Sequence, residues 1–362
     1  MHYAEHPYLQ AVIGKFQVEV IPCFAISPHE EIKSAVDRSP LHMDYLQRML
    51  SAKQKRDVRV MKKLLKVKGI YGAEAEIGGF SGLVCEQLML NYQSLENLLK
   101  EVAKWRPPVY IDIEGSWEAH IKLGKQRLAE KFPEAKLVLI DAIDRNRNAA
   151  AAITPESLAR FVLLARAFVK RPSVKFFREG KTKVQITKLK HELKKRQTTL
   201  VAALAKKPNV VDDILHPQLK RTEKNIARHL QLAGFEVIGS ASVCSKRDCA
   251  LLFEVSHGQL PVVKKLQGPP AWNFDHAAKF LKGKKVIRGP YLENEKICVD
   301  VERRERKVEE VFKRLLKEKD TGIASHFAKP CQHARITVLP KGLKGTVAEA
   351  ANRYLTFEKL II

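Results

Sequence analysis

Residues 199–255 decide the fold class, because TLVAAL (199–204), QLKRTEKNIARHLQLA (218–233), EVI (236–238) and ALLFEV (250–255) follow one another there. The three short apolar runs are typical of strands, and the long stretch between them repeats its apolar residues with the period of a helix. This strand, helix, strand, strand order, continued by a helix expected near residues 273–282, indicates a ferredoxin-like arrangement. The sequence therefore predicts an α+β protein.

The part of the chain before residue 199 is predicted to begin with a hairpin and to continue mainly as helices. Residues 9–13 and 16–21 are rich in β-branched and aromatic residues and flank a turn at Gly14-Lys15. Apolar periodicity and chain-breaking residues predict helices at 56–68, 81–90, 95–104 and 157–170, strands at 109–113 and 137–140, a strand and a helix within 173–199, and later helices at 302–319 and 347–354. Ser94 and Thr154 are predicted helix caps.

The charge balance indicates a polyanionic partner. The chain has 65 Lys and Arg residues against 40 Asp and Glu residues, a formal net charge of +25 and an isoelectric point near 9.8. Cations placed near phosphates release condensed counterions, which favours binding to nucleic acid. No apolar run approaches the ~20 residues that span a bilayer, and residues 1–14 have no signal-peptide core, so no membrane partner is expected.

The cysteine pattern argues against a zinc site. The six cysteines are Cys23, Cys85, Cys244, Cys249, Cys298 and Cys331. None of them forms a CxxC pair, which is the usual half of a zinc ribbon. The prediction is therefore a set of reduced, half-buried thiols in a cytoplasmic protein.

Several short blocks together resemble one known family. They are YAEHPY (3–8), VEVIPCF (18–24), IKSAVDRSP (32–40), GIYGAE (69–74), GFSG (79–82) and VVDD (210–213). In this order they are similar to archaeal-type, class I CCA-adding enzymes, which are tRNA nucleotidyltransferases. The resemblance implies four parts: a palm remnant at 1–50, a helical neck at 51–130, an α+β body at 131–198 plus 322–362, and a ferredoxin-like tail at 199–321.

The chain departs from the family pattern at its start. Family members carry a Gly-Ser motif and an Asp-x-Asp pair in the first part of the palm, and neither motif precedes Tyr3. The expectation is a chain that lacks this N-terminal part of the palm and, with it, two catalytic carboxylates. Residues 112–116, DIEGS, imitate both motifs, but in the wrong order and in the wrong domain, so they are interpreted as a strand end and a turn.

Glu19 is the candidate for the remaining catalytic carboxylate. By the resemblance it occupies the position that binds a metal ion, and the family uses Mg²⁺, which prefers carboxylate and phosphate oxygens. The strand pattern leaves a second interpretation open. Phe16, Val18 and Val20 alternate with Gln17 and Glu19, so Glu19 can also be a solvated residue on the polar face of a strand.

Four further residues are candidates for nucleotide binding. His42, Lys62 and Tyr71 match family residues that contact the triphosphate, and Arg147 matches an arginine that shapes the pocket selecting the incoming nucleotide. An arginine can offer two parallel hydrogen bonds to a base edge or a phosphate, which a lysine cannot reproduce. Each residue also has an ordinary interpretation as a surface or half-buried residue, and Arg147 can instead pair with Asp141 or Asp144.

The resemblance implies template-independent addition or repair of the 3′-terminal CCA of tRNA, with CTP and ATP as substrates. The loss of two catalytic carboxylates is expected to impair this activity in the chain. The basic stretches 168–196 and 280–320 are expected to follow the acceptor and T stems of tRNA. Members of the family often form homodimers, so the resemblance is compatible with a homodimer. Two alternatives stay open: a non-catalytic tRNA-binding remnant or one half of a split enzyme, and a relative of the poly(A) polymerases.

Overall fold

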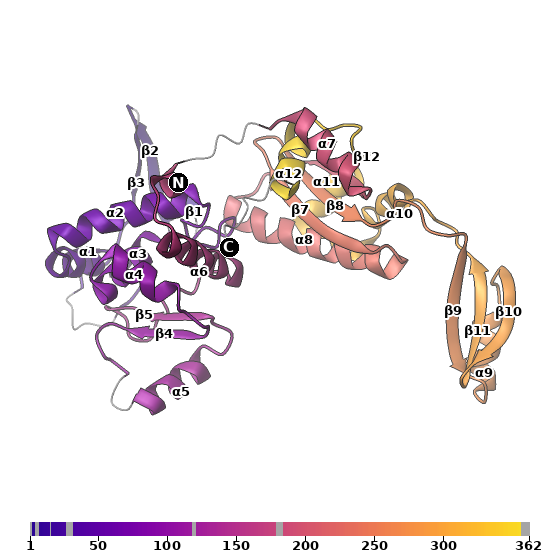
Figure 1. Cartoon of the computed structure of the whole chain (residues 1–362), viewed down its shortest axis with the longest axis horizontal. Helices are drawn as coiled ribbons and strands as arrows, with labels where there is room; N and C mark the ends of the chain where they lie inside the picture. The colour runs from indigo at the N-terminus through magenta and orange to yellow at the C-terminus, as the bar shows by residue number, and fades with distance from the viewer. Residues whose placement is uncertain are drawn as a thin grey trace. The chain divides into compact units, whose positions relative to one another are not determined.

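The computed structural model describes residues 2–3, 7–14, 16–26, 32–117, 121–178 and 184–355. The chain forms two compact units, one of residues 1–181 with 359–362 and one of residues 182–358 (Figure 1). Helices and strands are mixed in both units, which confirms the predicted α+β class. Within the described ranges, no helix has the length and apolar character needed to cross a membrane.

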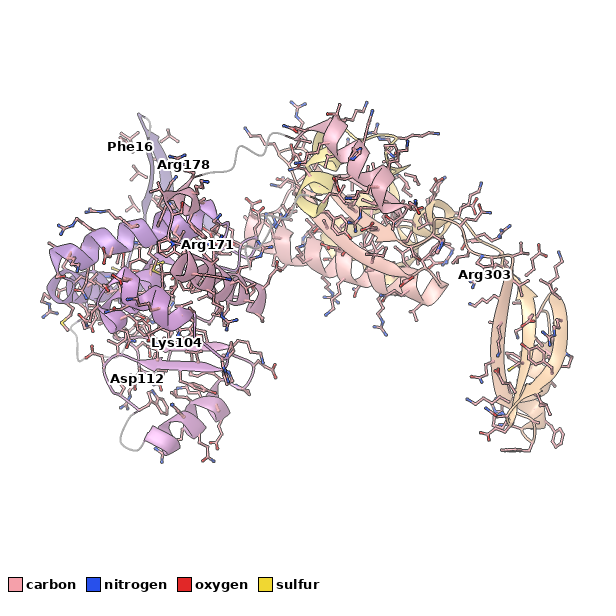
Figure 2. All side chains as sticks on the ribbon, viewed as in Figure 1. Phe16, Lys104, Asp112, Arg171, Arg178 and Arg303 are labelled. Atoms are coloured by element: carbon pink, nitrogen blue, oxygen red, sulfur yellow. A yellow bond between two sulfur atoms is a disulfide. The ribbon has the colours of Figure 1, made fainter. Side chains whose placement is uncertain are left out.

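The first unit begins with the predicted hairpin. Its strands β1 (His2–Tyr3), β2 (Pro7–Ile13) and β3 (Phe16–Val20) form an antiparallel sheet in the order β1-β2-β3. Ile13 lies opposite Phe16 across the turn, and Gly14 at the turn has a φ of +62°, a conformation that glycine adopts without steric cost. The Phe16 side chain is 74% exposed at the end of the hairpin (Figure 2).

Five helices and a short 3₁₀ turn build most of the first unit. They are η1 (Ala35–Asp37), α1 (Arg38–Met49), α2 (Ala52–Val67), α3 (Gly82–Tyr92), α4 (Leu95–Val102) and α6 (Pro155–Lys170). Ser94 and Thr154 accept hydrogen bonds from backbone N–H groups in the first turns of α4 and α6, as predicted. Such caps satisfy donors that the helix itself leaves free.

One apolar core joins these helices. Met61, Leu64 and Leu65 of α2 are fully buried, as the helical period of the sequence predicts. The rings of Phe80 and Phe161 meet edge to face with centroids 4.7 Å apart, so the loop before α3 packs directly on α6. Helix α6 therefore shares its core with α2–α4, although they are distant in sequence.

A pair of parallel strands leads directly into the candidate site. Strands β4 (Val109–Asp112) and β5 (Leu137–Ile140) pair in parallel, with Asp112 opposite Ile140. Parallel strands need a crossover connection, and α5 (Ile121–Lys131) lies on it. The carboxyl ends of the two strands thus lie at the same edge, and residue 141 follows directly from the buried strand β5.

The second unit is built on a four-stranded antiparallel sheet in the order β12-β6-β8-β7. Its strands are β6 (Thr199–Lys206), β7 (Val237–Cys244), β8 (Asp248–Val255) and β12 (Arg335–Val338). Helix α8 (Asp212–Ala233) connects β6 to β7, and α10 (Val308–Leu315) precedes β12. This order and the antiparallel pairing give a ferredoxin-like arrangement.

Both faces of this sheet are covered. On one face Val201 and Phe253 pack among residues of α8, α10 and α11 (Ser325–Gln332). On the other face Leu200 and Leu252 pack against α7 (Ile186–Arg196) and α12 (Gly345–Leu355). Successive strand residues point to opposite faces, and both faces of this sheet are buried, which is why the run 200–204 is apolar without interruption.

A second sheet is inserted between β8 and α10. Its strands β9 (Val263–Pro270), β10 (Val286–Glu293) and β11 (Lys296–Glu302) lie in the order β10-β11-β9, and α9 (Phe274–Leu281) packs on β9. The chain enters and leaves through paired segments, because Arg303 N donates to Val262 O at 2.8 Å and Leu260 N to Arg306 O at 2.9 Å. Figure 2 labels Arg303, whose guanidinium also donates to Ala233 O at the end of α8.

Two local predictions about helices and strands were wrong. The helix predicted near 273–282 exists as α9, but the second helix of the ferredoxin-like arrangement is α10, whose apolar residues share the core of α8. The strand predicted after residue 173 is instead a 3₁₀ turn, η2 (Val174–Phe177), in which Phe176 is buried. A further 3₁₀ turn, η3 (Lys319–Thr321), follows α10. The division into four domains stays a prediction, and residues 131–181 lie in the first compact unit while 182–198 lie in the second.

The prediction of reduced cysteines was wrong at two positions. Strands β7 and β8 place Cys244 directly opposite Cys249, and the two form a disulfide. The sequence spacing of five did not reveal this pair, because only the hairpin register brings the two side chains together. Cys85, Cys298 and Cys331 are free and buried, and burial raises the pKa of Cys85 and of Cys331 to about 12.

Candidate functional site

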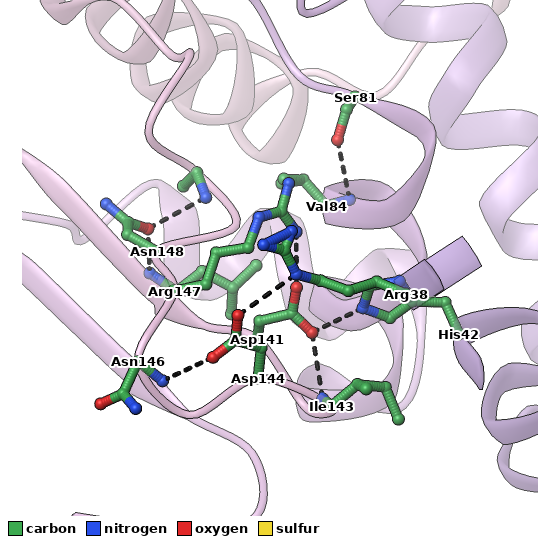
Figure 3. A network of polar contacts seen from close by, with 12 residues as sticks. Arg38, His42, Ser81, Val84, Asp141, Ile143, Asp144, Asn146, Arg147 and Asn148 are labelled. Atoms are coloured by element: carbon green, nitrogen blue, oxygen red, sulfur yellow. Dashed lines mark hydrogen bonds and ion pairs between the residues drawn. The ribbon is translucent and has the colours of Figure 1, made fainter. Parts of the chain in front are cut away.

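The centre of the candidate site is Asp141, the first residue after strand β5. Its side chain is fully buried and receives hydrogen bonds from two of the predicted residues (Figure 3). His42 Nε2 of α1 lies 2.6 Å from Asp141 Oδ1, and Arg147 donates to Asp141 Oδ2 at 2.5 Å. The N–H of Ile143 donates to the same carboxylate at 3.0 Å. Residues 42 and 147, distant in sequence, therefore meet at one carboxylate.

The surroundings keep this carboxylate ionised. Burial alone would raise the pKa of Asp141, because it disfavours the charged form. The hydrogen bonds from His42, Ile143 and Arg147, with the charge of His42, outweigh burial and lower this pKa to about 2. Asp141 therefore carries a negative charge at neutral pH and can hold two cationic or polar groups at once.

The loop that follows β5 is held from several sides. Arg38 of α1 donates to Asp144 Oδ2 at 3.2 Å, and the N–H of Arg147 donates to Asp144 O at 2.9 Å. Trp117 Nε1 donates to the backbone oxygen of Arg145 at 3.0 Å, while the Arg145 side chain is exposed. These contacts leave Arg147, rather than its neighbour, as the arginine turned to the buried carboxylate.

Lys62 and Tyr71 come together at the start of α3. A Cβ atom added to Gly82 would lie 3.4 Å from Lys62 Nζ and 3.5 Å from the Tyr71 hydroxyl, so both polar ends reach the same first turn. Ser81 caps this turn by accepting a hydrogen bond from Val84 N at 3.2 Å (Figure 3). The start of a helix carries partial positive charge, so a lysine and a hydroxyl beside it form surroundings suited to an anion.

Lys62 is paired inside the protein. Its Nζ lies 2.6 Å from Glu86 Oε1 of α3, and both side chains are about one quarter exposed. Burial lowers the pKa of Lys62, but the hydrogen bond to Glu86 and the negative charge of Glu86 raise this pKa by a larger amount, so the net shift is upward. The ammonium group is therefore charged at neutral pH and stands between Glu86 and the helix start.

Glu19 lies on β3, opposite Gln10, and is exposed. Within the part of the chain that the structure describes, it takes no part in the contacts of Asp141 or in those at the start of α3. The described residues contain no group of three or more His, Cys, Asp or Glu side chains able to hold a metal ion. The role of Glu19 as a metal ligand stays a prediction.

The imitation motif at 112–116 has its own local contacts. Asp112 Oδ2 accepts a hydrogen bond from Trp117 N at 2.7 Å, and Tyr45 donates to Glu114. Strand β4 ends at Asp112, as the interpretation of a strand end and a turn requires. Burial, followed by the hydrogen bond to Glu114, raises the pKa of Tyr45.

The sequence analysis named Asp141 only as an alternative partner of Arg147, and the structure shows this pair; it did not place Asp141 in the site, and it missed Glu86. One signal could have found Asp141: it follows the run LVLI at the carboxyl end of a buried parallel strand, where polar side chains gather. Asn148 in the same loop is also buried and bonds Leu139 N and Leu137 O, so it closes the loop onto β5. No sequence signal identified Glu86, because its partner lies 24 residues away on another helix.

Two family models match the chain. A model described as "tRNA nucleotidyltransferase, second domain" matches residues 56–178, and one described as "CCA-adding enzyme, C-terminal domain" matches residues 196–336. The first range contains Lys62, Tyr71 and Arg147, and the second contains most of the ferredoxin-like sheet.

Curated relatives from archaea match over most of this chain. A CCA-adding enzyme of Methanoregula boonei is 38% identical over 304 residues, which are 83% of this chain and 63% of the relative. The similar protein of Archaeoglobus fulgidus is 35% identical over 81% of this chain and 64% of the relative. That of Methanothermobacter thermautotrophicus is 31% identical over 88% and 67%. The chain thus spans 63 to 67% of the length of these three relatives.

Proposed function

The chain belongs to the family of CCA-adding enzymes, and from this we propose that it takes part in adding or repairing the 3′-terminal CCA of tRNA, with CTP and ATP as substrates. The observation that carries the proposal is the arrangement of the first unit. His42 and Arg147 converge on Asp141, and Lys62 and Tyr71 converge on the start of α3. These are donors of the kind that a nucleoside triphosphate requires.

Each candidate residue has a proposed role. Lys62, Tyr71 and His42 contact the triphosphate, where a charged ammonium, a hydroxyl and an imidazolium with hydrogen on both ring nitrogens offset the negative oxygens. Arg147 contacts the base or a phosphate with the part of its guanidinium that Asp141 does not engage; its side chain is 38% exposed. Nucleotidyl transfer depends mainly on positioning and on stabilising charge, so these contacts favour it without covalent participation.

A divalent ion belongs to the proposal through Glu19. The family resemblance implies Mg²⁺, which when bound would stabilise negative charge at the transferred phosphoryl group. Glu19 carries an exposed carboxylate. The described residues contain no group of three or more His, Cys, Asp or Glu side chains that could hold a metal ion. We therefore propose Glu19 as a ligand and assign no step of the transfer to the ion.

The proposed polynucleotide partner is tRNA, bound through its acceptor and T stems. Helix α7 supports this choice, because Leu189 and Leu193 are buried on one side while Lys188, Lys190, Lys194 and Lys195 are exposed. A row of exposed cations suits an RNA duplex, which proteins recognise mainly through phosphates, 2′-hydroxyls and shape. The cytoplasmic location and the homodimer stay predictions.

A second candidate function is tRNA binding without nucleotide transfer, either as a remnant or as one half of a split enzyme. The net charge of +25 and the cationic face of α7 favour it independently of the nucleotide site. The two candidates differ in what the chain does with labelled nucleotide.

The test uses tRNA transcripts that lack CCA, labelled CTP and ATP, and Mg²⁺. The proposal expects the label to enter the transcript and addition to stop after the terminal A. A tRNA that binds but receives no label would support the second candidate instead. Continued addition of A would indicate a poly(A) polymerase-like activity, and the Lys62→Met variant controls for a contaminating enzyme.

A further inference from the structure

One buried carboxylate lies between two residues to which we assign nucleotide contacts. Asp141 is 1% exposed, so it can act on a ligand only through His42 and Arg147. The inference below rests on the proposed function of these two residues. It concerns the group that holds them, which neither family resemblance nor sequence pattern assigned to the site.

The contact with His42 determines how the imidazole can be used. Asp141 is ionised and can only accept, so Nε2 must carry the hydrogen of the 2.6 Å bond. The other ring nitrogen, Nδ1, has no hydrogen-bond partner within the described residues and is the one available to a ligand. It donates to a phosphate oxygen when it too carries a hydrogen, that is, when the ring is an imidazolium. Because His42 is only 8% exposed, its ring has little freedom to rotate and present Nε2 instead.

The contact with Arg147 restricts the guanidinium in the same way. One terminal nitrogen is held by Asp141 at 2.5 Å, and the backbone N–H of Arg147 is held by Asp144 O at 2.9 Å. A guanidinium has five N–H donors in a rigid plane, so fixing one edge orients the other. The remaining donors are then presented in a fixed direction.

We propose that Asp141 is a positioning residue that fixes His42 with Nδ1 toward the nucleotide and, at the same time, orients the guanidinium of Arg147. It thereby links the side chain that contacts the triphosphate to the one that selects the nucleotide. Loss of the carboxylate releases both. The charged groups around Asp141 are His42 from α1 and Arg147 from its own loop, with the Arg38–Asp144 pair beside them.

The first test reads the His42 ring directly in the unmodified chain. Long-range ¹H–¹⁵N NMR of histidine-labelled protein distinguishes the two ring nitrogens, and the His42→Gln variant identifies the signal among the 12 histidines. We expect Nε2 to bear a proton. A neutral ring protonated at Nδ1 alone would overturn the inference, whatever the activity of the chain.

The second test replaces Asp141 by Asn, which preserves its shape and removes its charge. We expect CTP and ATP to bind about tenfold more weakly or worse, since the loss of one hydrogen bond to a charged group changes affinity by about that factor. The NMR signal of His42 should change to a mixture of tautomers. The matched control is Asp44→Asn. Asp44 lies on α1, the helix that carries His42, and its exposed carboxylate pairs with Arg48 of that helix.

The outcomes separate the inference from the function on which it rests. If the unmodified chain binds no nucleotide, the proposed function fails, while the NMR result still judges the role of Asp141. If the unmodified chain binds nucleotide and Asp141→Asn binds it as tightly as Asp44→Asn does, the positioning role is wrong. If Asp141→Asn does not fold, the tautomer in the unmodified chain decides.

Discussion

Lys62 of α2 and Glu86 of α3 form an ion pair, with 2.6 Å between Nζ and Oε1, directly beside the first turn of α3. The pair joins two core helices and also holds the ammonium group at the place where the proposed triphosphate contact is needed. An incoming phosphate and the Glu86 carboxylate therefore compete for the ammonium group of Lys62. This competition leads to the first prediction.

Lys62→Met should weaken CTP and ATP binding about tenfold or more, because a charge-assisted hydrogen bond is lost. Glu86→Gln should bind nucleotide at least as tightly as the unmodified chain, since it removes the competing carboxylate. Equilibrium titration with labelled nucleotide measures both. Lys53→Met, an exposed lysine on the same helix, is the control. Equal affinities for all four proteins would contradict the role of Lys62.

The second prediction concerns acid stability and Asp141. Its folded pKa of about 2 lies below the ordinary value of 3.8, so its ionisation stabilises the fold above pH 3.8. That stabilisation, about 2 kcal/mol from a shift of this size, is lost as the pH falls from about 4 to about 2. Asp141→Asn should therefore be less stable than the unmodified chain at pH 7, and the difference should shrink below pH 4.

Urea denaturation at pH 7, 4 and 3 measures this difference. Asp44→Asn serves as the control because its carboxylate is exposed in an i,i+4 pair, and such pairs contribute little to stability. A stability difference for Asp141→Asn that does not depend on pH would show that the carboxylate's charge is not the source of stabilisation.

A buried carboxylate in the second unit supports the third prediction. Glu254 of β8 receives two hydrogen bonds from Arg196, at 2.6 and 2.7 Å, one from Tyr354 at 2.6 Å and one from Thr198. Burial raises the pKa of Glu254, but these donors, Arg196 first, lower it by more. The cluster ties α7 and α12 to the sheet.

Arg196→Met should destabilise the second unit by about 2 kcal/mol, because it leaves a buried carboxylate without its main partner. The figure is at the low end for such changes since the Arg196 side chain is 38% exposed. Urea denaturation followed by circular dichroism measures the loss. Lys195→Met changes an exposed neighbour on the same helix and should stay within about 0.5 kcal/mol of the unmodified chain. A similar result for both variants would exclude the proposed effect.

The fourth prediction concerns the cationic face of α7. Replacing Lys190 and Lys194 together by Gln should weaken tRNA binding and reduce the slope of log K against log salt by about 1 to 2. Filter binding at several KCl concentrations measures the slope. The control is the replacement of Lys53 and Lys55 of α2 by Gln, which removes the same charge. An unchanged slope for the α7 variant would place the RNA elsewhere.

Much of the secondary structure could be predicted from local pattern. The apolar stripe of Val58, Met61, Leu64 and Leu65 predicted α2, and the Ser94 and Thr154 caps predicted the starts of α4 and α6. These features succeed because neighbouring residues on one helix determine them. The assignment of α9 failed because its apolar residues pack on an inserted sheet, which local periodicity cannot distinguish from the main one.

Local pattern and short blocks in a fixed order were enough to predict the α+β class, the family and the residue types suited to binding phosphate. Three contacts could be seen only in the folded chain: His42 and Arg147 share Asp141, Lys62 pairs with Glu86, and Cys244 is bonded to Cys249. These pairings depend on which strand ends and helix faces meet. Packing of distant segments selects them, and no spacing along the chain encodes them.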